Sequence, residues 1–277
     1  MLDFNTRINI FKKASLCRKY EEAVYKKIQQ GLFQFPFYLS AGQEFIPAAM
    51  SEAINGNPLI FAQHRAHSTY LSYGGCINEL TQELLGNKSG CSNGMGGSAS
   101  IQSKKIGMFG HDGLMGSQVP IAVGACLASK KLTLAIMGDA SAEEDYVMAA
   151  IAWAGTKKLP IIFVVEDNNL SILTEKKIRR NWEMSDFANS VSVKGYNIQD
   201  DPETIYNTTK DALNNLPALI NINTTRLFWH ANAGQDSYER FDRYEDELNK
   251  IGNQAYEIDL NNKTYVENIW EKNLETR

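Results

Sequence analysis

The sequence predicts an α/β fold with a mainly parallel sheet flanked by helices. Short apolar runs at 132–137 and 160–165 lie on either side of a helical pattern, giving strand, helix and strand within about 30 residues. The second run is continuously apolar, which is typical of a strand buried on both faces of a parallel sheet. Such a unit should cross over with right-handed geometry. A third run at 218–223 follows a helix predicted near 203–214 and should add another strand.

Length and composition fit this class. The 277 residues are 43% hydrophobic and 22% charged, which is typical of a globular protein and argues against disorder. We expect one α/β domain over 1–277. Four cysteines without a Cys-x-x-Cys pair and four histidines without zinc-motif spacing predict neither a disulfide framework nor a structural zinc site.

Charge and hydropathy bear on the partners and the location of the protein. The formal net charge is −4, so the basic surface that general nucleic-acid binding requires is not expected. No apolar run approaches 18 residues, so we expect no transmembrane helix. The first residues carry scattered charges instead of an apolar core, so we expect no secretory signal. A cytoplasmic protein that binds neither nucleic acid nor membrane is the resulting prediction.

The first half of the chain combines helical patterns with a glycine-rich segment. Residues 6–30 should form an amphipathic helix, and an apolar helical pattern runs from 42 to 53. The segment Gly86–Gly116 contains nine glycines. This predicts backbone with positive φ or close approach to a ligand, with a flexible surface loop as the alternative. Residues 117–131 then read as a buried helix that leads into the first predicted strand.

After that strand, the sequence indicates a turn and a second helix. Ser141 and Glu144 have the spacing of a capping box, with Ser141 at the N-cap. Tyr146, Ala150 and Trp153 continue the apolar stripe of this helix. Beyond 236 the chain becomes acidic and polar. A C-terminal extension at about 237–277 should therefore form peripheral helices or an arm onto a partner.

Polar residues follow the two strands of the predicted unit. Asp139 comes directly after the first strand, and Asn168 follows the second. Parallel strands bind ligands beyond their carboxyl ends, so both side chains should lie at one sheet edge. A carboxylate and an amide oxygen suit Mg²⁺, while Gly138 and the N–H groups of the next helix suit a phosphate. We predict a Mg²⁺–diphosphate site here, the alternative being an N-cap and a turn.

The spacing of these residues resembles the thiamine-diphosphate signature, in which Gly-Asp-Gly is followed nearly thirty residues later by Asn-Asn. The chain is similar to the alpha subunits of the 2-oxo acid dehydrogenase family, of the pyruvate, branched-chain and acetoin type. The resemblance implies the thiamin diphosphate-binding fold, and specifically its diphosphate-binding domain. Further segments match the family in order: Gly42–Gln43–Glu44, His64–Arg65–Ala66–His67, Gly86 to Ser98, Gly113 to Pro120, and Arg226 to His230.

The resemblance assigns roles to individual residues. Asp139, Asn168 and the carbonyl of Leu170 would bind Mg²⁺, and His230 would donate or accept a proton near the reaction centre. His67 would contact the substrate, whereas His111 has no firm counterpart in the family. The remaining implied contacts with thiamine diphosphate come from His64, Arg65, Gly113, Met115, Gly138, Ala140, Ser141 and again His230.

Several positions depart from the family pattern. Ala140 replaces the last glycine of Gly-Asp-Gly, and Tyr38 stands where a histidine is usual. His64 replaces an aromatic residue, Trp229 replaces a glycine, and Ala231 replaces a serine that is phosphorylated in some members. Control by that phosphorylation is therefore not expected. The changes around the pocket also make the usual small 2-oxo acid questionable as the substrate.

The resemblance implies an enzyme that decarboxylates a 2-oxo acid and passes the acyl or aldehyde unit to an acceptor such as a lipoyl carrier. A beta subunit would supply a pyrimidine-binding domain and a glutamate, in an α/β heterotetramer. One alternative is a stand-alone carboligase or transketolase-like enzyme that adds a two-carbon or acyl unit to an aldehyde, a sugar or another acceptor. The segment 167–172 favours it. The second alternative is a non-catalytic alpha-like scaffold. The candidate site residues argue against it, because all four are retained: Asp139, Asn168, Arg65 and His230.

Overall fold

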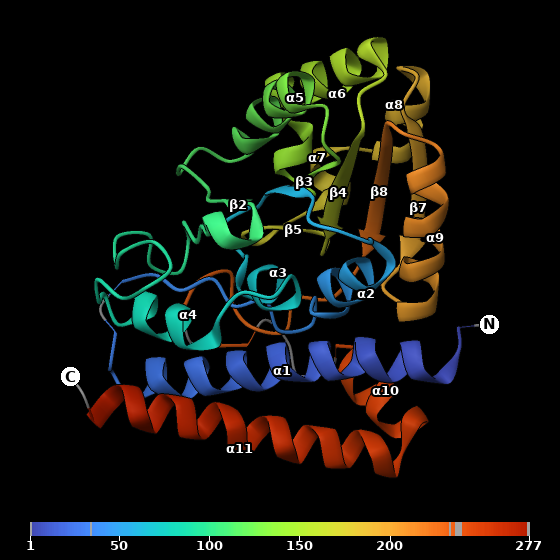
Figure 1. The fold of residues 1–277 in the computed structure, drawn as a ribbon. Helices are drawn as coiled ribbons and strands as arrows, with labels where there is room; N and C mark the ends of the chain where they lie inside the picture. Colours follow the sequence, from blue (N-terminus) through green and yellow to red (C-terminus); the bar gives the residue numbers. More distant parts are fainter. Residues whose placement is uncertain (1, 34, 233, 236–239, 276–277) are drawn as a thin grey trace.

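The computed structural model describes residues 2–33, 35–232, 234–235 and 240–275. It confirms the predicted α/β class: a six-stranded sheet has the order β2-β1-β3-β4-β8-β7, and every neighbouring pair is parallel (Figure 1). The strands are β1 (Leu59–Phe61), β2 (Met108–Phe109), β3 (Thr133–Gly138), β4 (Ile161–Asp167), β7 (Lys194–Gln199) and β8 (Ala218–Asn223).

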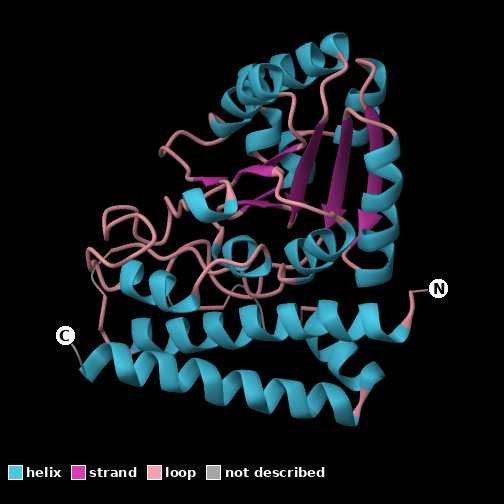
Figure 2. Cartoon of the chain, viewed as in Figure 1, coloured by secondary structure: helices cyan, strands magenta, loops and turns pink. Residues whose placement is uncertain are grey.

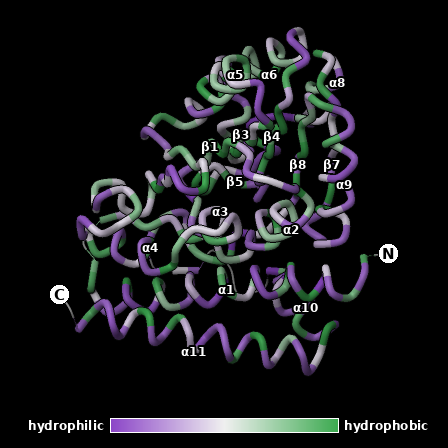
Figure 3. Tube along the Cα trace, in the orientation of Figure 1, coloured by the Kyte–Doolittle hydropathy of each residue, from purple (hydrophilic) through white to green (hydrophobic). Residues whose placement is uncertain are grey.

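The central strands are buried on both faces. In β4, Ile162 and Val164 belong to one hydrophobic cluster, whereas Phe163 and Val165 belong to another on the opposite face. This double burial explains the continuous apolar run, because each side chain of the strand points into one of the two cores. Figure 3 shows the same hydrophobic centre. The covering helices are α2 (Phe45–Ala53) and α9 (Pro202–Asn214) on the first face, and α5 (Gln118–Ser129), α6 (Asp145–Lys157) and α8 (Met184–Ser190) on the second.

A layer of helices lies below the sheet. Helix α11 (Asn253–Glu275) runs alongside α1 (Phe4–Gln29), as Figure 2 shows, and α10 (Arg243–Ile251) connects to it. The predicted C-terminal helices are therefore present, and they pack on the first helix of the same chain. Among the described parts of the chain, no helix combines the length and apolar character needed to span a bilayer. The short elements are α3 (His67–Ser72), α4 (Ile77–Leu84), α7 (Lys176–Arg179), the 3-10 turns η1 (Lys104–Ile106) and η2 (Ser141–Glu143), and the hairpin β5 (Leu170–Ser171) and β6 (Thr174–Glu175).

The predicted capping box is wrong. Helix α6 begins at Asp145, with Glu144 at its N-cap, and Ser141 instead begins the 3-10 turn η2. The Ser141 hydroxyl accepts from the N–H of Gly138 and donates to the Gly138 carbonyl, at 3.0 Å in each case. The serine is thus engaged by the backbone before it, a local bond that competes with helix capping.

Strand β7 was not predicted from the sequence. It lies at the edge of the sheet, and each of its residues is exposed or half-buried. An edge strand with one solvated face lacks the apolar run that marks β4. Strands β1 and β2 have only three and two residues, so they were too short for a periodic pattern.

Two helical glycines provide a matched test of the packing. A Cβ added at Gly155 in α6 would meet the carbonyl oxygen of Val191 at 2.1 Å, whereas one at Gly124 in α5 would meet nothing within 4 Å. We expect Gly155→Ala to lower the free energy of unfolding by about 2 kcal/mol, because backbone must move. Gly124→Ala should raise it by up to about 1 kcal/mol through helix propensity. Urea unfolding measures both, and equal effects would contradict this packing.

Candidate functional site

The candidate site is a cavity of about 340 Å³ at the carboxyl ends of β3 and β4. Asp139 comes directly after β3, and Asn168 comes directly after β4. The pairing of Gly138 with Glu166 places the two strand ends level at the same edge of the sheet. The lining residues are Gln63, His64, Arg65, Met115, Gly138, Asp139, Ala140, Ser141, Glu144, Asn168, Leu170, Ser171, Ile172, Arg226 and His230. Most of the residues proposed from the sequence therefore surround one cavity.

The predicted metal ligands all line this cavity. Burial raises the pKa of Asp139, the nearby Asp167 raises it further, and Arg179 opposes the shift. Arg179 forms an ion pair with Oδ2 of Asp139. The side-chain oxygen of Asn168 accepts the N–H of Leu170 at 3.1 Å. A cation held by Asp139 would take the place of the Arg179 guanidinium.

This donor set fits a hard divalent cation. It comprises one carboxylate, one amide oxygen and one backbone carbonyl, from Asp139, Asn168 and Leu170. Within the described residues, no three His, Cys, Asp or Glu side chains gather around a common metal position. Mg²⁺ commonly takes few protein oxygens and completes its shell with water and phosphate oxygens. The residues therefore fit a metal that is shared with a diphosphate.

Arg65 and His230 also line this cavity. Nη1 of Arg65 donates to the carbonyl of Leu39 at 2.5 Å, and Nη2 donates to the carbonyl of His230 at 3.1 Å. Nη2 also lies 3.5 Å from Nδ1 of His230. Because a guanidinium only donates, a hydrogen bond across this separation would require Nδ1 to accept and would place the proton of a neutral ring on Nε2.

His64 lies beside these residues and is held neutral. Burial lowers its pKa to about 2, and the charge of Arg65 adds to the shift. The unfolded chain therefore takes up a proton near pH 6.5 that the folded protein excludes, and stability is lost as the pH falls below 6.5. Between pH 7 and pH 5 we expect the wild type to lose about 2 kcal/mol more unfolding free energy than His64→Asn. Urea unfolding at both pH values tests this, and equal losses would show that His64 titrates normally.

His67 occupies a different position from the one predicted. It is fully buried, with Nδ1 3.1 Å from a carboxylate oxygen of Glu21 and Nε2 3.0 Å from the hydroxyl of Ser98. The same hydroxyl accepts the backbone N–H of Tyr38 at 2.9 Å. The structure thus places His67 in the interior, where it supports Tyr38 through Ser98, and does not bring it into the lining of the cavity, where a substrate contact was predicted.

The predicted contacts of Gly113 and Met115 are only partly reproduced. Met115 lines the cavity, but its carbonyl accepts the hydroxyl of Tyr146. Gly113 has a φ of +104°, which explains the glycine, yet it lies outside the cavity lining.

The sequence analysis assigned no role to several residues of the site. Nε2 of Gln63 donates to the buried Glu166, and burial raises the pKa of Glu166 to about 7. Gln43 accepts a hydrogen bond from the Asn168 amide at 3.4 Å, so the Gly-Gln-Glu motif positions a proposed metal ligand. Its membership of a matched motif could have indicated this role. No sequence motif pointed to Arg179. It reaches Asp139, at the end of β3, only because the hairpin β5–β6 positions α7 in the folded chain.

The glycine-rich segment is organised by one carboxylate. Glu83, at the end of α4, is fully buried and accepts four backbone N–H groups. The donors are Ser92 at 2.7 Å, Gly94 at 2.9 Å, Gly96 at 2.7 Å and Gly97 at 3.1 Å. This part of the segment is therefore wrapped around Glu83, and Ser98 follows it directly. The loop thus helps to set the position of Tyr38, whose backbone N–H donates to the Ser98 hydroxyl.

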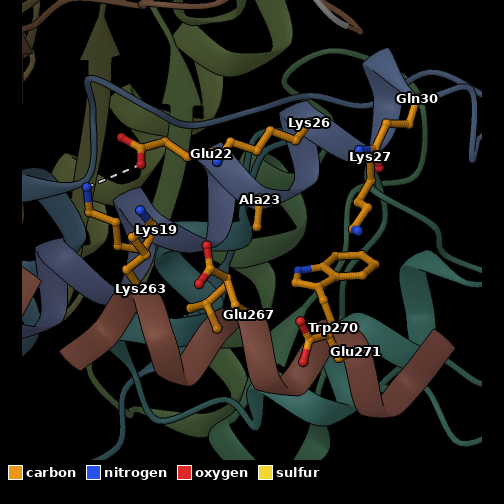
Figure 4. A pocket seen from close by; sticks show the side chains of 11 residues that line it. Lys19, Glu22, Ala23, Lys26, Lys27, Gln30, Lys263, Glu267, Trp270 and Glu271 are labelled. Carbon is orange, nitrogen blue, oxygen red and sulfur yellow. Dashed lines mark hydrogen bonds and ion pairs between the residues drawn. The ribbon is translucent and has the colours of Figure 1, made fainter. Parts of the chain in front are cut away.

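Another cavity, of about 230 Å³, lies between α1 and α11 (Figure 4). Lysines and glutamates from both helices alternate around it, and Lys19 forms ion pairs with Glu22 at 3.2 Å and Asp259 at 2.9 Å. It includes no strand end and none of the residues proposed from the sequence. The sheet-edge cavity is therefore the candidate active site.

Comparison with known proteins agrees with this geometry. Residues 12–276 match the family model described as the dehydrogenase E1 component. The chain belongs to this family. The predicted family is thereby confirmed, and membership implies thiamine diphosphate as the cofactor of this E1 chain.

Similar proteins include pyruvate dehydrogenase E1 alpha subunits. The mitochondrial protein of Solanum tuberosum is 28% identical over 242 residues, covering 84% of this chain and 62% of the relative. That of Rickettsia prowazekii is 26% identical, covering 94% and 84%. The alpha subunit of acetoin:2,6-dichlorophenolindophenol oxidoreductase from Cupriavidus necator is 28% identical, covering 63% and 54%. The E1 chain spans about 62% of the length of the plant relatives that it matches.

Proposed function

We propose that this E1 chain is the alpha subunit of a thiamine-diphosphate-dependent enzyme that decarboxylates a 2-oxo acid and passes the acyl unit to an acceptor. The observation that carries the proposal is the convergence of Asp139, Asn168, Arg65 and His230 on one cavity at the carboxyl edge of the sheet. When bound, thiamine diphosphate supplies a nucleophilic carbon and accepts the electron pair left by the departing carbon dioxide.

The residues of this chain then have distinct tasks. Asp139, Asn168 and the carbonyl of Leu170 would hold Mg²⁺, and the first N–H groups of η2 at Ser141 would bind the diphosphate, since such groups have no partner within the turn. Arg65 would offset phosphate charge. His230 would hold or return a proton through Nε2, because Arg65 occupies its other nitrogen.

The proposed partner is a beta subunit that completes the site with a pyrimidine-binding domain. The relatives are named as subunits of pyruvate dehydrogenase and of an acetoin oxidoreductase, which supports an enzyme built from two kinds of subunit. The same names favour decarboxylation, or cleavage of a related carbon–carbon bond, over a carboligase reaction. A lipoyl carrier is the proposed acceptor, and the cytoplasm is the proposed location.

The test uses this chain assembled with its beta subunit. Release of carbon dioxide from added 2-oxo acids should require Mg²⁺, thiamine diphosphate and both subunits together. A complex that takes up the cofactor yet cleaves no 2-oxo acid or hydroxyketone would contradict the proposed activity.

A further inference from the structure

Three side chains that depart from or lie outside the family pattern gather beside His230. The ring centroid of His64 lies 4.7 Å from that of Tyr38, 5.9 Å from that of His111 and 5.4 Å from that of His230. Tyr38 and His230 are 5.5 Å apart. We call Tyr38, His64 and His111 the imidazole cluster. Of the three, His64 lines the sheet-edge cavity, beside His230.

The imidazole cluster has buried nitrogens without partners. His64 is 9% exposed and His111 is 4% exposed. Among the described residues, Nε2 of His64 has no hydrogen-bond partner, and neither ring nitrogen of His111 has one with normal geometry, although the amide oxygen of Gln118 lies close enough to His111 to influence its pKa. Leaving such a group unpaired costs about 1–3 kcal/mol, so a group of this kind requires an explanation. A bound molecule that forms hydrogen bonds with these nitrogens would explain why they are left unpaired here.

The charge state of the two histidines limits which functional groups of a bound molecule could pair with them. Burial lowers the pKa of both rings, with Arg65 contributing at His64, so both are neutral at physiological pH. A neutral imidazole offers one donor and one acceptor. An alkyl group would pair with neither nitrogen, and a carboxylate would pair only with the donor. A hydroxyl group both donates and accepts, so it matches both nitrogens of the ring.

The surroundings of His111 are polar as well. It lines a second cavity, of about 310 Å³, whose other lining residues include Ser92, Ser100, Gln102 and Asp112. These side chains also suit hydroxyl groups, and the His111 ring lies 5.9 Å from that of His64, which lines the sheet-edge cavity.

We propose that the imidazole cluster recognises hydroxyl groups of the substrate, so that this enzyme acts on 2-oxo acids with hydroxyl groups beyond the carbonyl. The inference rests on the proposed function and adds its substrate class. His64, which lines the sheet-edge cavity and has Tyr38 packed against its ring, contacts the hydroxyl nearest the reacting carbonyl, and His111 binds the more distant part of the chain. Tyr38 and His111 thereby contribute to specificity alone, whereas His64 shares its cavity with the cofactor-binding residues of the sheet edge.

The test compares substrates that differ by one hydroxyl group. Pyruvate and hydroxypyruvate, and 2-oxobutanoate and 4-hydroxy-2-oxobutanoate, are given to the assembled complex with Mg²⁺, thiamine diphosphate and an artificial electron acceptor. We expect kcat/KM to be at least tenfold higher for the hydroxylated member of each pair. His111→Leu should reduce that ratio about tenfold, mainly through KM, and His111→Asn should retain most of it because the amide still donates and accepts.

Controls separate this inference from the proposed function. The Kd for thiamine diphosphate is measured by calorimetry on each complex, and the wild-type ratio decides the question even if a variant fails to fold. A complex that binds the cofactor but favours the unsubstituted acids, or a His111→Leu ratio equal to that of the wild type, would overturn the inference alone. A wild-type complex that binds no thiamine diphosphate would overturn the proposed function, and the inference with it.

Discussion

Replacement of Asp139 by alanine is expected to abolish Mg²⁺-dependent binding of thiamine diphosphate while the chain stays folded. Asp139 is the one carboxylate among the proposed metal ligands, so its loss removes the charged donor of the site. We expect the affinity to fall at least a hundredfold, equivalent to about 3 kcal/mol. The fold should survive because Arg179 keeps its second ion pair, with Glu143 at 2.6 Å.

The measurement is a calorimetric titration of the assembled complex with thiamine diphosphate, with and without Mg²⁺. Asp145→Ala is the matched control, since this exposed carboxylate lies at the start of α6 only six positions further along the chain. Near-normal affinity in Asp139→Ala would show that the cofactor is held elsewhere.

The second large effect is expected at Glu83. In Glu83→Gln, one carboxylate oxygen that accepts backbone N–H groups becomes an NH₂ group that faces them. Two of the four backbone donors then lose their partner, at about 1–3 kcal/mol each where the donor is buried. We expect the free energy of unfolding to drop by about 3 kcal/mol, and the loop from 86 to 98 to become sensitive to protease.

Urea unfolding and limited proteolysis measure these changes. Glu79→Gln is the control, because Glu79 lies one turn earlier in α4 and forms an ion pair with the exposed Lys105. Such a surface pair contributes less than about 1 kcal/mol. If both variants lost the same small amount, the loop would not depend on Glu83.

The edge of the sheet was predictable from the sequence because apolar runs locate the ends of buried parallel strands. Asp139 and Asn168 follow such runs directly, so their proximity follows from the topology of one crossover unit. The capping box at Ser141 failed because two local hydrogen-bonding patterns compete for the same serine. A sequence pattern does not show which of them the folded backbone favours.

Contacts between distant segments could not be predicted in this way. Gln63 and Glu166 meet because β1 and β4 both flank β3, and His111 reaches His64 because β2 lies beside β1. Strands β1 and β2 are too short to produce a periodic pattern. His67 is a different case: it belongs to a matched motif, yet it lies at the start of α3 in the interior, in contact with Glu21 and Ser98. The motif singled out His67, but it did not show in which direction the side chain points.

The central claim is that the sheet-edge cavity holds thiamine diphosphate, and its most direct test is the cofactor content of the complex. The chain is purified with its beta subunit in Mg²⁺ buffer and denatured, and the released small molecules are identified by mass spectrometry. The account predicts close to one thiamine diphosphate for each αβ pair. A well-formed complex that releases none would show that the fold of the dehydrogenase E1 component family is retained here without its cofactor.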